Sequence, residues 1–330
     1  MDSYFIPFLD PQLLMVRYNE ISRFLHRTPI LTSKSLDFEN NASLFFKCEN
    51  FQKSGAFKMR GVSNAIFELL LKKEKPEGVV AHSSGNHGQA LAWAAQSHDI
   101  PCKVVMPSNA SEFKKKAVLA AGAEIIECFP TILARKAAVK KVCKNSAFIE
   151  IHPSNQPSVI LGQGSAAWEL LEDCQQRDVS LDWIGVPIGG GGLAAGTGFA
   201  VSVWNNLHGT ATKVFCGEPS GADDAFRSLI SGKIEFNKNP YTVADGLRTE
   251  LGDINFPIIK KTIKEIYLVS DKEILEGQIK LAERLKIVLE TNCSPPFSAI
   301  CKNLERFNGK KVGIIISGGN VDLRSSVWGE

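Results

Sequence analysis

The sequence predicts an α/β fold of two lobes, in which helices cover sheets of mainly parallel strands. Short apolar runs of β-forming residues alternate with longer runs of helical spacing through most of the 330 residues. Such alternation is typical of parallel sheets covered by helices. The chain is also long enough for two lobes, and it contains no repeat, low-complexity tract or long flexible linker.

The expected elements follow one another along the chain and alternate in type. The strands are expected at 79–81, 103–106, 124–126, 183–188, 213–216 and 312–316. The clearest helical patterns are at 86–97, 112–121 and 271–289.

The charged residues argue against a nucleic-acid surface. The formal net charge is only +3, and the basic residues are spread along the chain. The densest basic cluster, at 114–116, is short and has no interleaved aromatic residues. It therefore predicts a solvated helix face.

Cysteine usage and the N-terminus predict a cytoplasmic protein. The eight cysteines form no C-x-x-C pair, which suggests a reducing compartment. The first residues, Met1 to Tyr4, lack the basic and apolar regions of a secretory signal. The long uncharged stretch at 183–212 contains Pro187 and a glycine run, so it predicts strand, loop and buried helix rather than a membrane span.

A run of glycines is the first candidate functional motif. It consists of Gly189, Gly190, Gly191 and Gly192. The run separates an apolar strand pattern from a helix start, and this order favours an anion cradle made of backbone N–H groups. The same residues fit a dinucleotide-binding pattern loosely, so a nicotinamide dehydrogenase is an alternative.

Two more segments place polar residues at predicted helix starts. Lys58 begins an amphipathic helix, where partial burial would lower the pKa of a lysine amine, but an ordinary surface lysine is the better explanation of this segment alone. The segment at 83–88 lies between a strand and a helix, and its free amides and hydroxyls suit a carboxylate. His87 has no G-x-S-x-G elbow beside it, so we expect no hydrolase.

Two further segments are ambiguous when taken alone. Glu218 and Asp224 lie on a predicted turn and suit a hard divalent ion, but taken alone the segment favours a helix cap by Ser220 or Asp223. Ser317 follows the last predicted strand, where ligands bind in α/β sheets. A plain turn is an equally good interpretation of that serine.

Seven segments in order carry a family resemblance: SGAFKMRG, SSGNHGQALA, GQGSAAWEL, PIGGGGLAAG, GEPSGADDA, VADGL and SGGNVDL. From about Thr28 to Leu323 the chain resembles the fold-type II pyridoxal-phosphate (PLP) enzymes, which are tryptophan synthase β-like, and most closely the serine racemase and threonine dehydratase group. The resemblance implies a large cofactor-binding domain of residues 1–77 and 156–330 and a small mobile domain of residues 78–155.

The resemblance implies a role for each cofactor-site residue. Lys58 would form the Schiff base and act as the base on one face of the substrate. Phe57 belongs to the same site, and Asn86 would bond the cofactor's ring oxygen. The four glycines would hold the phosphate. Ser317 would contact the pyridine nitrogen, and a neutral serine there would leave that nitrogen largely unprotonated.

Substrate and metal ligands are implied in the same way. Ser84 matches the hydroxyl that exchanges a proton on the opposite face in racemases. The implied substrate site consists of Ser83, Ser84, Gly85, Asn86, His87, Arg135 and Ser154. The implied Mg²⁺ or Ca²⁺ site consists of Glu218, the Ala222 carbonyl and Asp224, and this reading replaces the helix cap.

The implied activity is a PLP-dependent amino-acid racemase. Serine is the leading substrate, and β-elimination to pyruvate and ammonia is a side reaction. A dedicated serine/threonine dehydratase and an aspartate racemase are alternatives, because Ser154 replaces an asparagine of the family's HPNQEP motif. A homodimer is expected, and ATP is open as an activator because some members of the group respond to it.

The segment at 290–296 departs from the family, which has Glu-Pro followed by small residues and glycines there. Ser294 as N-cap and Pro295 at the first helical position would start the next helix well. The two prolines stiffen a loop expected near the cofactor, where they could narrow the pocket or impair activity. A non-catalytic regulatory member of the fold is therefore a further hypothesis.

Overall fold

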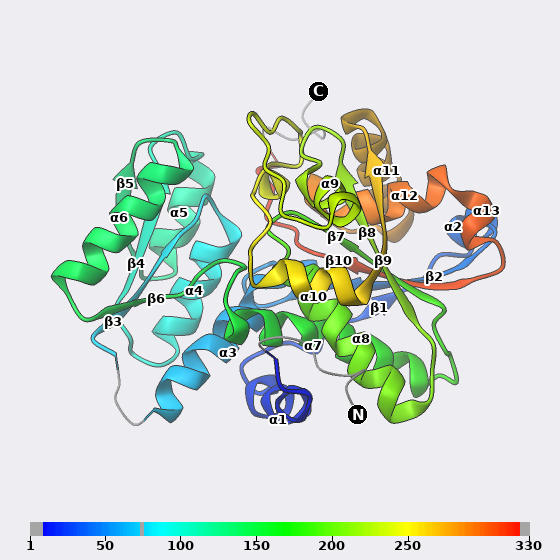
Figure 1. The fold of residues 1–330 in the computed structure, drawn as a ribbon, viewed down its shortest axis with the longest axis horizontal. Coiled ribbons are helices and arrows are strands. Elements are labelled where there is room, and N and C mark those ends of the chain that lie inside the picture. Colours follow the sequence, from blue (N-terminus) through cyan, green and yellow to red (C-terminus); the bar gives the residue numbers. More distant parts are fainter. Residues whose placement is uncertain (1–8, 73–75, 324–330) are drawn as a thin grey trace.

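Two separate sheets organise the chain, one on each side of Figure 1. The computed structural model describes residues 9–72 and 76–323, and Met1 to Tyr4, on which the prediction about a secretory signal rests, lie outside them. The larger sheet has the strand order β1-β2-β10-β7-β8-β9, and all neighbours are parallel except β1 and β2. Its strands are β1 (Ile30–Leu31), β2 (Ser43–Cys48), β7 (Trp183–Pro187), β8 (Lys213–Pro219), β9 (Ile263–Val269) and β10 (Lys311–Ile316).

The smaller sheet is entirely parallel and has the order β5-β4-β3-β6. Its strands are β3 (Gly78–His82), β4 (Cys102–Pro107), β5 (Glu124–Cys128) and β6 (Phe148–Glu150). They all fall within the range predicted for the small domain, 78–155. The domain boundaries and the mobility of that domain stay predictions.

Helices cover both faces of the larger sheet, because its strands alternate apolar side chains between two cores. On β7, Ile184 and Val186 point into one core and Trp183 into the other. The first core is closed by α1 (Pro11–Ser22), α7 (Pro157–Gln175), α8 (Gly192–His208) and α10 (Asn255–Thr262). The second is closed by α2 (Lys34–Asn40), α11 (Asp271–Leu285), α12 (Pro295–Lys302) and α13 (Leu304–Phe307).

The smaller sheet is covered in the same manner, and α3 joins the two halves of the molecule. Met59 and Val62 of α3 share a core with Val79 and Val104 of the smaller sheet, while α3 also contacts α7. The helices around this sheet are α3 (Lys58–Leu71), α4 (Asn86–Gln96), α5 (Glu112–Ala120) and α6 (Ile132–Asn145). The remaining elements are α9 (Asp224–Ser231) and the short 3₁₀ turns η2 (Glu49–Phe51), η3 (Asp245–Leu247) and η4 (Thr291–Cys293).

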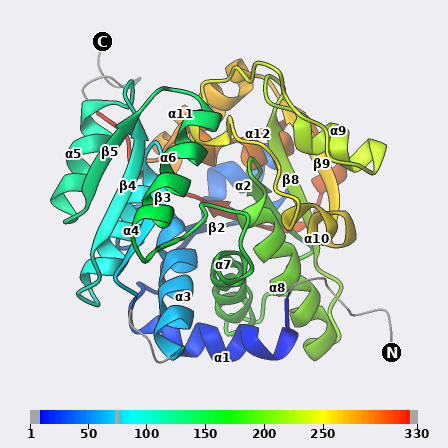
Figure 2. The ribbon, with the colours of Figure 1, turned by 60° about the vertical axis from the view of Figure 1, so that its left-hand side comes forward.

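Close backbone contact fixes the helices that carry the site. Figure 2 shows α3, α7 and α8 side by side above α1. A Cβ on Gly164 of α7 would lie 2.7 Å from the Gly196 carbonyl oxygen of α8, so only glycine permits this approach. The N-termini of α3 and α8, which begin at Lys58 and Gly192, are therefore held in a fixed relation through α7.

The predicted elements are found, with two corrections. All six predicted strands occur, each within a few residues of its expected ends. The helix expected at 271–289 ends at Leu285, because Lys286 adopts a left-handed conformation with φ 58°. Pro295 does begin a helix, but the Ser294 hydroxyl does not cap it and instead donates to the Ile274 carbonyl at 2.7 Å.

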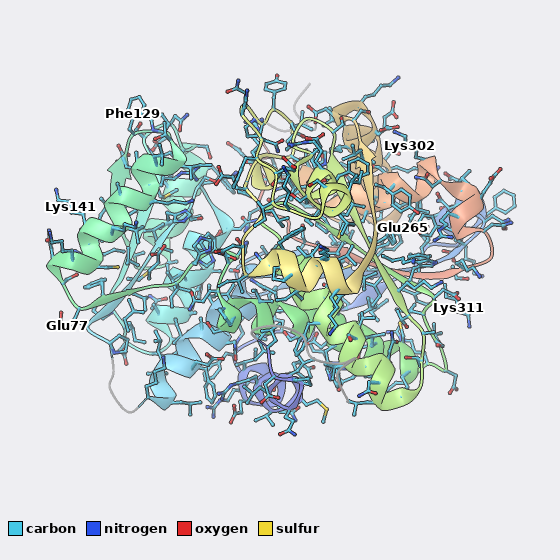
Figure 3. All side chains as sticks on the ribbon, in the orientation of Figure 1. Glu77, Phe129, Lys141, Glu265, Lys302 and Lys311 are labelled. Atoms are coloured by element: carbon cyan, nitrogen blue, oxygen red, sulfur yellow. The ribbon has the colours of Figure 1, made fainter. Side chains whose placement is uncertain are left out.

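The surface agrees with the dispersed charge of the sequence. Figure 3 shows Lys141 at the outer edge of the smaller sheet's half, whereas Lys302 and Lys311 lie on the opposite side of the molecule. Within residues 9–72 and 76–323, no helix is long and apolar enough to cross a membrane.

Candidate active site

Both sheets direct strand ends toward one cavity. In the smaller sheet the strand order reverses between β3 and β6, and in the larger sheet it reverses between β7 and β10. Ligands of open α/β sheets bind outside the carboxyl ends of the strands at such reversals. The segments that follow all four strands contribute to a single cavity of about 210 Å³.

Most of the predicted site residues meet in this cavity. Those that line it are Phe57, Lys58, Ser83, Ser84, Gly85, Asn86, His87, Arg135, Ser154, Gly189, Gly190, Gly191, Gly192 and Ser317. The predicted metal ligands Glu218, Ala222 and Asp224 do not line it. The individual roles given to these residues stay predictions.

Lys58 has the environment that a reactive amine needs. It is the first residue of α3, and its Nζ donates to the Pro153 carbonyl at 2.7 Å. Burial lowers the pKa of Lys58 to about 8, because the ammonium ion loses hydration. The Phe57 N–H donates to the Ser317 carbonyl at 2.9 Å, so the start of α3 is tied to the end of β10.

The glycine run forms the expected cradle between β7 and α8. The first turn of α8 leaves backbone N–H groups without intrahelical acceptors, and the helix dipole favours an anion there. Gly191 has φ +86°, which side-chain-bearing residues rarely adopt. A Cβ on Gly190 would lie 2.6 Å from Ser154 Oγ, so the 152–154 segment packs directly on the loop. These features fit the phosphate of PLP.

Asn86 is held by residues that the sequence analysis gave no role. Its Nδ2 donates to Glu290 Oε1 at 2.7 Å, and its Oδ1 accepts from Asn320 Nδ2 at 3.0 Å. Asn292 Nδ2 donates to the other Glu290 oxygen at 2.9 Å. Burial raises the pKa of the Glu290 carboxyl, and the hydrogen bond from Asn86 opposes that shift. This network fixes the Asn86 amide across more than 200 residues of sequence separation.

The β3–α4 loop offers hydroxyl and backbone donors. The Gly85 N–H donates to Ser83 Oγ at 3.0 Å, and Ser84 is exposed at the cavity. His87 lies in the first turn of α4, and its Nε2 donates to the Ile151 carbonyl at 2.9 Å. Burial holds the pKa of His87 well below its usual range, so the ring is neutral. This contact is structural, as expected for a histidine in that turn.

The departure at 290–296 contributes Glu290 and Asn292 to the cavity lining, whereas its later residues pack beneath the site. Cys293 Sγ lies 3.4 Å from Ser317 Oγ and donates to the Gly318 carbonyl at 2.9 Å. Burial raises the pKa of the Cys293 thiol to about 12, so the thiol is neutral. Pro295 packs against Gly217 of β8 and does not line the cavity. Neither proline lines the cavity, so the prolines do not narrow it directly, and an effect of this loop on activity stays a prediction.

Two ion pairs at the cavity were also missed. Lys114 of α5 pairs with Asp245, and Lys136 of α6 lies 3.7 Å from Glu250. The motif VADGL pointed to the neighbourhood of Asp245. The sequence did not predict either ion pair, because more than 100 residues separate the two partners.

Glu218 acts as a helix cap in this structure. Its two carboxylate oxygens accept from the Ala225 N–H at 2.9 Å and the Phe226 N–H at 2.8 Å. Asp223 and Ser220 were the expected caps, but the Asp223 side chain makes no cap bond. Glu218 takes this role because it reaches the first turn of α9 from the end of β8.

The same carboxylates have the character of a cation site. Glu218 and Asp224 are buried, and among the described residues neither forms an ion pair. Burial, and then the charge of Asp224, raises the pKa of Glu218, while burial raises that of Asp224 to about 6. Among the described residues, no group of three His, Cys, Asp or Glu side chains is arranged to hold a metal ion, and the third predicted ligand, at Ala222, is a backbone carbonyl. Asp224 also accepts from Asn237 Nδ2 at 2.8 Å and from the Leu251 N–H at 2.9 Å. These oxygens are of the type that hard divalent ions bind, and the cation itself stays a prediction.

The two sheets that meet at one cavity, the lysine with its lowered pKa and the glycine cradle together define an enzyme of the PLP-binding α/β class. Residues 21–318 match the family described as pyridoxal-phosphate dependent enzyme, and the chain belongs to that family. The fold-type II prediction is therefore confirmed, and the nicotinamide dehydrogenase alternative is wrong.

The chain is similar to PLP-dependent racemases and dehydratases over nearly its full length. It is 42% identical to beta-hydroxyaspartate dehydratase of Paracoccus denitrificans, covering 96% of this chain and 97% of that protein. It is 43% identical to serine racemase of Dictyostelium discoideum, covering 93% and 94%. The crystal structure of that racemase superposes with a TM-score of 0.88 at 41% identity, over 96% of this chain and 100% of the other. These similarities support a PLP-dependent racemase or dehydratase function.

Proposed function

We propose that this protein racemises a small amino acid at its α-carbon and eliminates a β-hydroxyl group as a side reaction, with serine as the leading substrate. The observation that carries this proposal is that Lys58, with its lowered pKa, and the Ser84 hydroxyl line one cavity from two elements, the start of α3 and the β3–α4 loop. When bound, PLP supplies an electron sink for the electron pair of the broken α-bond.

The residues divide the work between two sides of the substrate. The neutral Lys58 amine accepts the α-proton, because an amine with a pKa near 8 is a competent base near neutral pH. Ser84 holds a proton on the other side, where returning it inverts the centre. Ser83, Gly85 and Asn86, at the start of α4, hold the substrate carboxylate with hydroxyl and N–H donors.

Solvent exchange separates these roles. In D₂O the holoenzyme should exchange the α-hydrogen of L-serine and form both D-serine and pyruvate. Ser84→Ala should lose D-serine formation but keep elimination, whereas Lys58→Ala should lose both. Ser97→Ala, at the far end of α4, is the control. Racemisation by Ser84→Ala at the wild-type rate would refute the role of that hydroxyl.

An acidic amino acid is the second candidate substrate. The Paracoccus relative is named for β-hydroxyaspartate, and Ser154 here replaces the family asparagine beside the glycine cradle. A dedicated serine/threonine dehydratase is distinguished by the same experiment, because it would give pyruvate or a keto acid without the D-amino acid.

A divalent cation is part of the proposal. Mg²⁺ or Ca²⁺ would be held by Glu218, the Ala222 carbonyl and Asp224, where it would neutralise two buried carboxylates. This site lies outside the cavity, so the cation would support the fold and not contact the substrate.

The proposal also includes a cytoplasmic homodimer with a mobile small domain of residues 78–155. Trp93, Phe113 and Leu119 on α4 and α5 are exposed, and such apolar surface suits a subunit interface. All eight cysteines are free thiols, which suits a reducing compartment. ATP is a candidate activator in this proposal. Sedimentation analysis tests the dimer directly.

A further inference from the structure

A buried amide side chain, that of Asn255, packs directly against the glycine cradle. Asn255 is the first residue of α10, which lies beside α8 (Figure 1), and it is fully buried. A Cβ on Gly191 would lie 3.0 Å from Asn255 Cβ, which is closer than ordinary van der Waals contact. Asn255 does not itself line the cavity, so any effect on a ligand passes through the loop that it contacts.

The Asn255 amide donates hydrogen bonds to the backbone carbonyls of two other segments. Its Nδ2 lies 2.6 Å from the Gly190 carbonyl oxygen and 3.2 Å from the Ser154 carbonyl oxygen. Both partners can only accept, which fixes the orientation of the amide. The Gly190 carbonyl also accepts from the Gly252 N–H at 3.3 Å. One amide thus ties the glycine loop to the 152–154 segment.

These bonds are not those of a helix cap. An asparagine that caps a helix accepts an N–H of the first turn with its side-chain oxygen. The Asn255 Oδ1 is buried and has no hydrogen-bond partner among residues 9–72 and 76–323, and α10 begins without a side-chain cap bond. An unpaired buried oxygen costs free energy. The fold of α10 by itself therefore does not call for an amide at this position.

The contact with Gly190 fixes the direction of the next backbone N–H group. A trans peptide unit is planar, so its C=O and N–H point in opposite directions. Because the Gly190 carbonyl points to Asn255 and Gly252, the Gly191 N–H points away from them. Gly191 lines the cavity at the start of α8, where the helix dipole favours an anion. Without such a contact, a run of glycines has many accessible backbone conformations.

The contact with Ser154 joins the cradle to the segment that holds the reactive lysine. Ser154 follows Pro153, whose carbonyl accepts from Lys58 Nζ at 2.7 Å. The next residue, Asn155, accepts from the Ile254 N–H at 2.9 Å. The lysine-holding segment and the glycine loop are therefore both fastened to the start of α10.

We infer that Asn255 is a positioning residue for the cofactor phosphate: by holding the Gly190 and Ser154 carbonyls, its amide keeps the backbone N–H groups of the glycine cradle free to bind that phosphate. This inference rests on membership of the PLP family and not on the proposed racemase activity or its substrate. Binding measurements without turnover can therefore test it.

A comparison of PLP with pyridoxal tests this role, because the two compounds differ only in the phosphate. Full-length protein freed of cofactor is titrated with each compound, and visible absorbance reports attachment. Asn255→Ala should raise the dissociation constant of PLP roughly tenfold and that of pyridoxal less than about twofold. An equal rise for both compounds would indicate a general structural role and would overturn the inference, as would no change for either.

Asn40→Ala is the matched control. Asn40 is also buried and also donates to a backbone carbonyl, that of Leu36 at 2.8 Å, but it lies on α2 and outside the cavity. This variant should lower the midpoint of urea unfolding and leave the ratio of the two dissociation constants within about twofold of the wild-type ratio. A change of that ratio as large as in Asn255→Ala would overturn the inference. Asn255→Ser, which keeps a hydroxyl donor, should give an intermediate ratio and takes the place of Asn255→Ala if that variant does not fold.

Inorganic phosphate provides a second measurement that needs neither the ring nor the lysine. In phosphorus NMR titrations of the cofactor-free chain, phosphate should bind the wild type roughly tenfold more tightly than Asn255→Ala. Equal binding would count against the role of Asn255. Selective loss of phosphate and PLP binding in the variant, together with no amino-acid turnover by the wild type, would refute the proposed function but leave this inference intact.

Discussion

At the scale of single residues, the chemistry of the site depends on which charges are buried and which are paired. The Lys58 amine is buried against a carbonyl and loses its charge readily, whereas Lys114 forms an ion pair with Asp245. Arg135 is exceptional because it is partly buried and unpaired in the described chain. These differences could not be predicted from residue type, since each depends on neighbours that are distant in sequence.

The lowered pKa of Lys58 predicts how cofactor attachment depends on pH. With a pKa of about 8, about one-tenth of the amine is neutral at pH 7, against less than about one part in a thousand for an unperturbed lysine. The rate of PLP attachment to the apoprotein, followed by visible absorbance, should rise up to about pH 8 and then level off. Lys58→Ala should show no such absorbance. A rate that continues to rise to pH 10 would contradict the lowered pKa.

At the scale of elements, the sequence gives element type more reliably than element ends. The order of strand, loop and helix at β7 and α8 depends only on adjacent residues, so the sequence predicts it. The end of α11 is not, because it depends on one left-handed residue, Lys286. The cap of α9 was also not predicted. Its capping residue, Glu218, belongs to the preceding strand and reaches the helix across the turn between them.

The carboxylates at the start of α9 predict a response to divalent cations. Adding Mg²⁺ or Ca²⁺ to chelator-treated protein at pH 7 should raise the free energy of unfolding by roughly 2 to 3 kcal/mol at about 100 times the dissociation constant. Asp224→Asn should abolish the increase. Thermal or urea unfolding measures it, and an equal increase in the variant would exclude this site.

The pH trend provides a second check on the same site. Without cation, Asp224 has a raised pKa of about 6, so the folded state binds more protons than the unfolded state between about pH 6 and 4. The contribution of this carboxyl to stability therefore increases as the pH falls through that window. With a bound cation the carboxyl pKa drops, and the trend should reverse.

At the scale of the whole molecule, the site exists only because two sheets face each other. Its residues come from the ends of β3 and β6 in one sheet and of β7 and β10 in the other. Two ion pairs cross between these halves at the cavity, Lys114 with Asp245 and Lys136 with Glu250. They join α5 and α6 to the segment around η3.

These crossing pairs predict a dependence of substrate binding on ionic strength. Partly exposed ion pairs are screened by salt and contribute up to about 1 kcal/mol each. Lys114→Glu should therefore raise KM roughly 3- to 5-fold at low salt, and the double variant Lys114→Glu with Asp245→Lys should recover part of that loss. Lys116→Glu, exposed on the same helix, is the control. Failure of the double variant to improve on Lys114→Glu would argue against a direct pairing effect.

The sequence by itself determined the α/β class, the PLP family and most of the residues that line the cavity, because each motif is a contiguous strand end, loop and helix start. Only the tertiary structure placed Glu290 against Asn86, set Cys293 beneath Ser317 and left Arg135 without a carboxylate. Local patterns follow from backbone conformation and hydrophobic spacing within a few residues. Contacts, burial and charge pairing depend on how distant elements pack, and no local pattern encodes them.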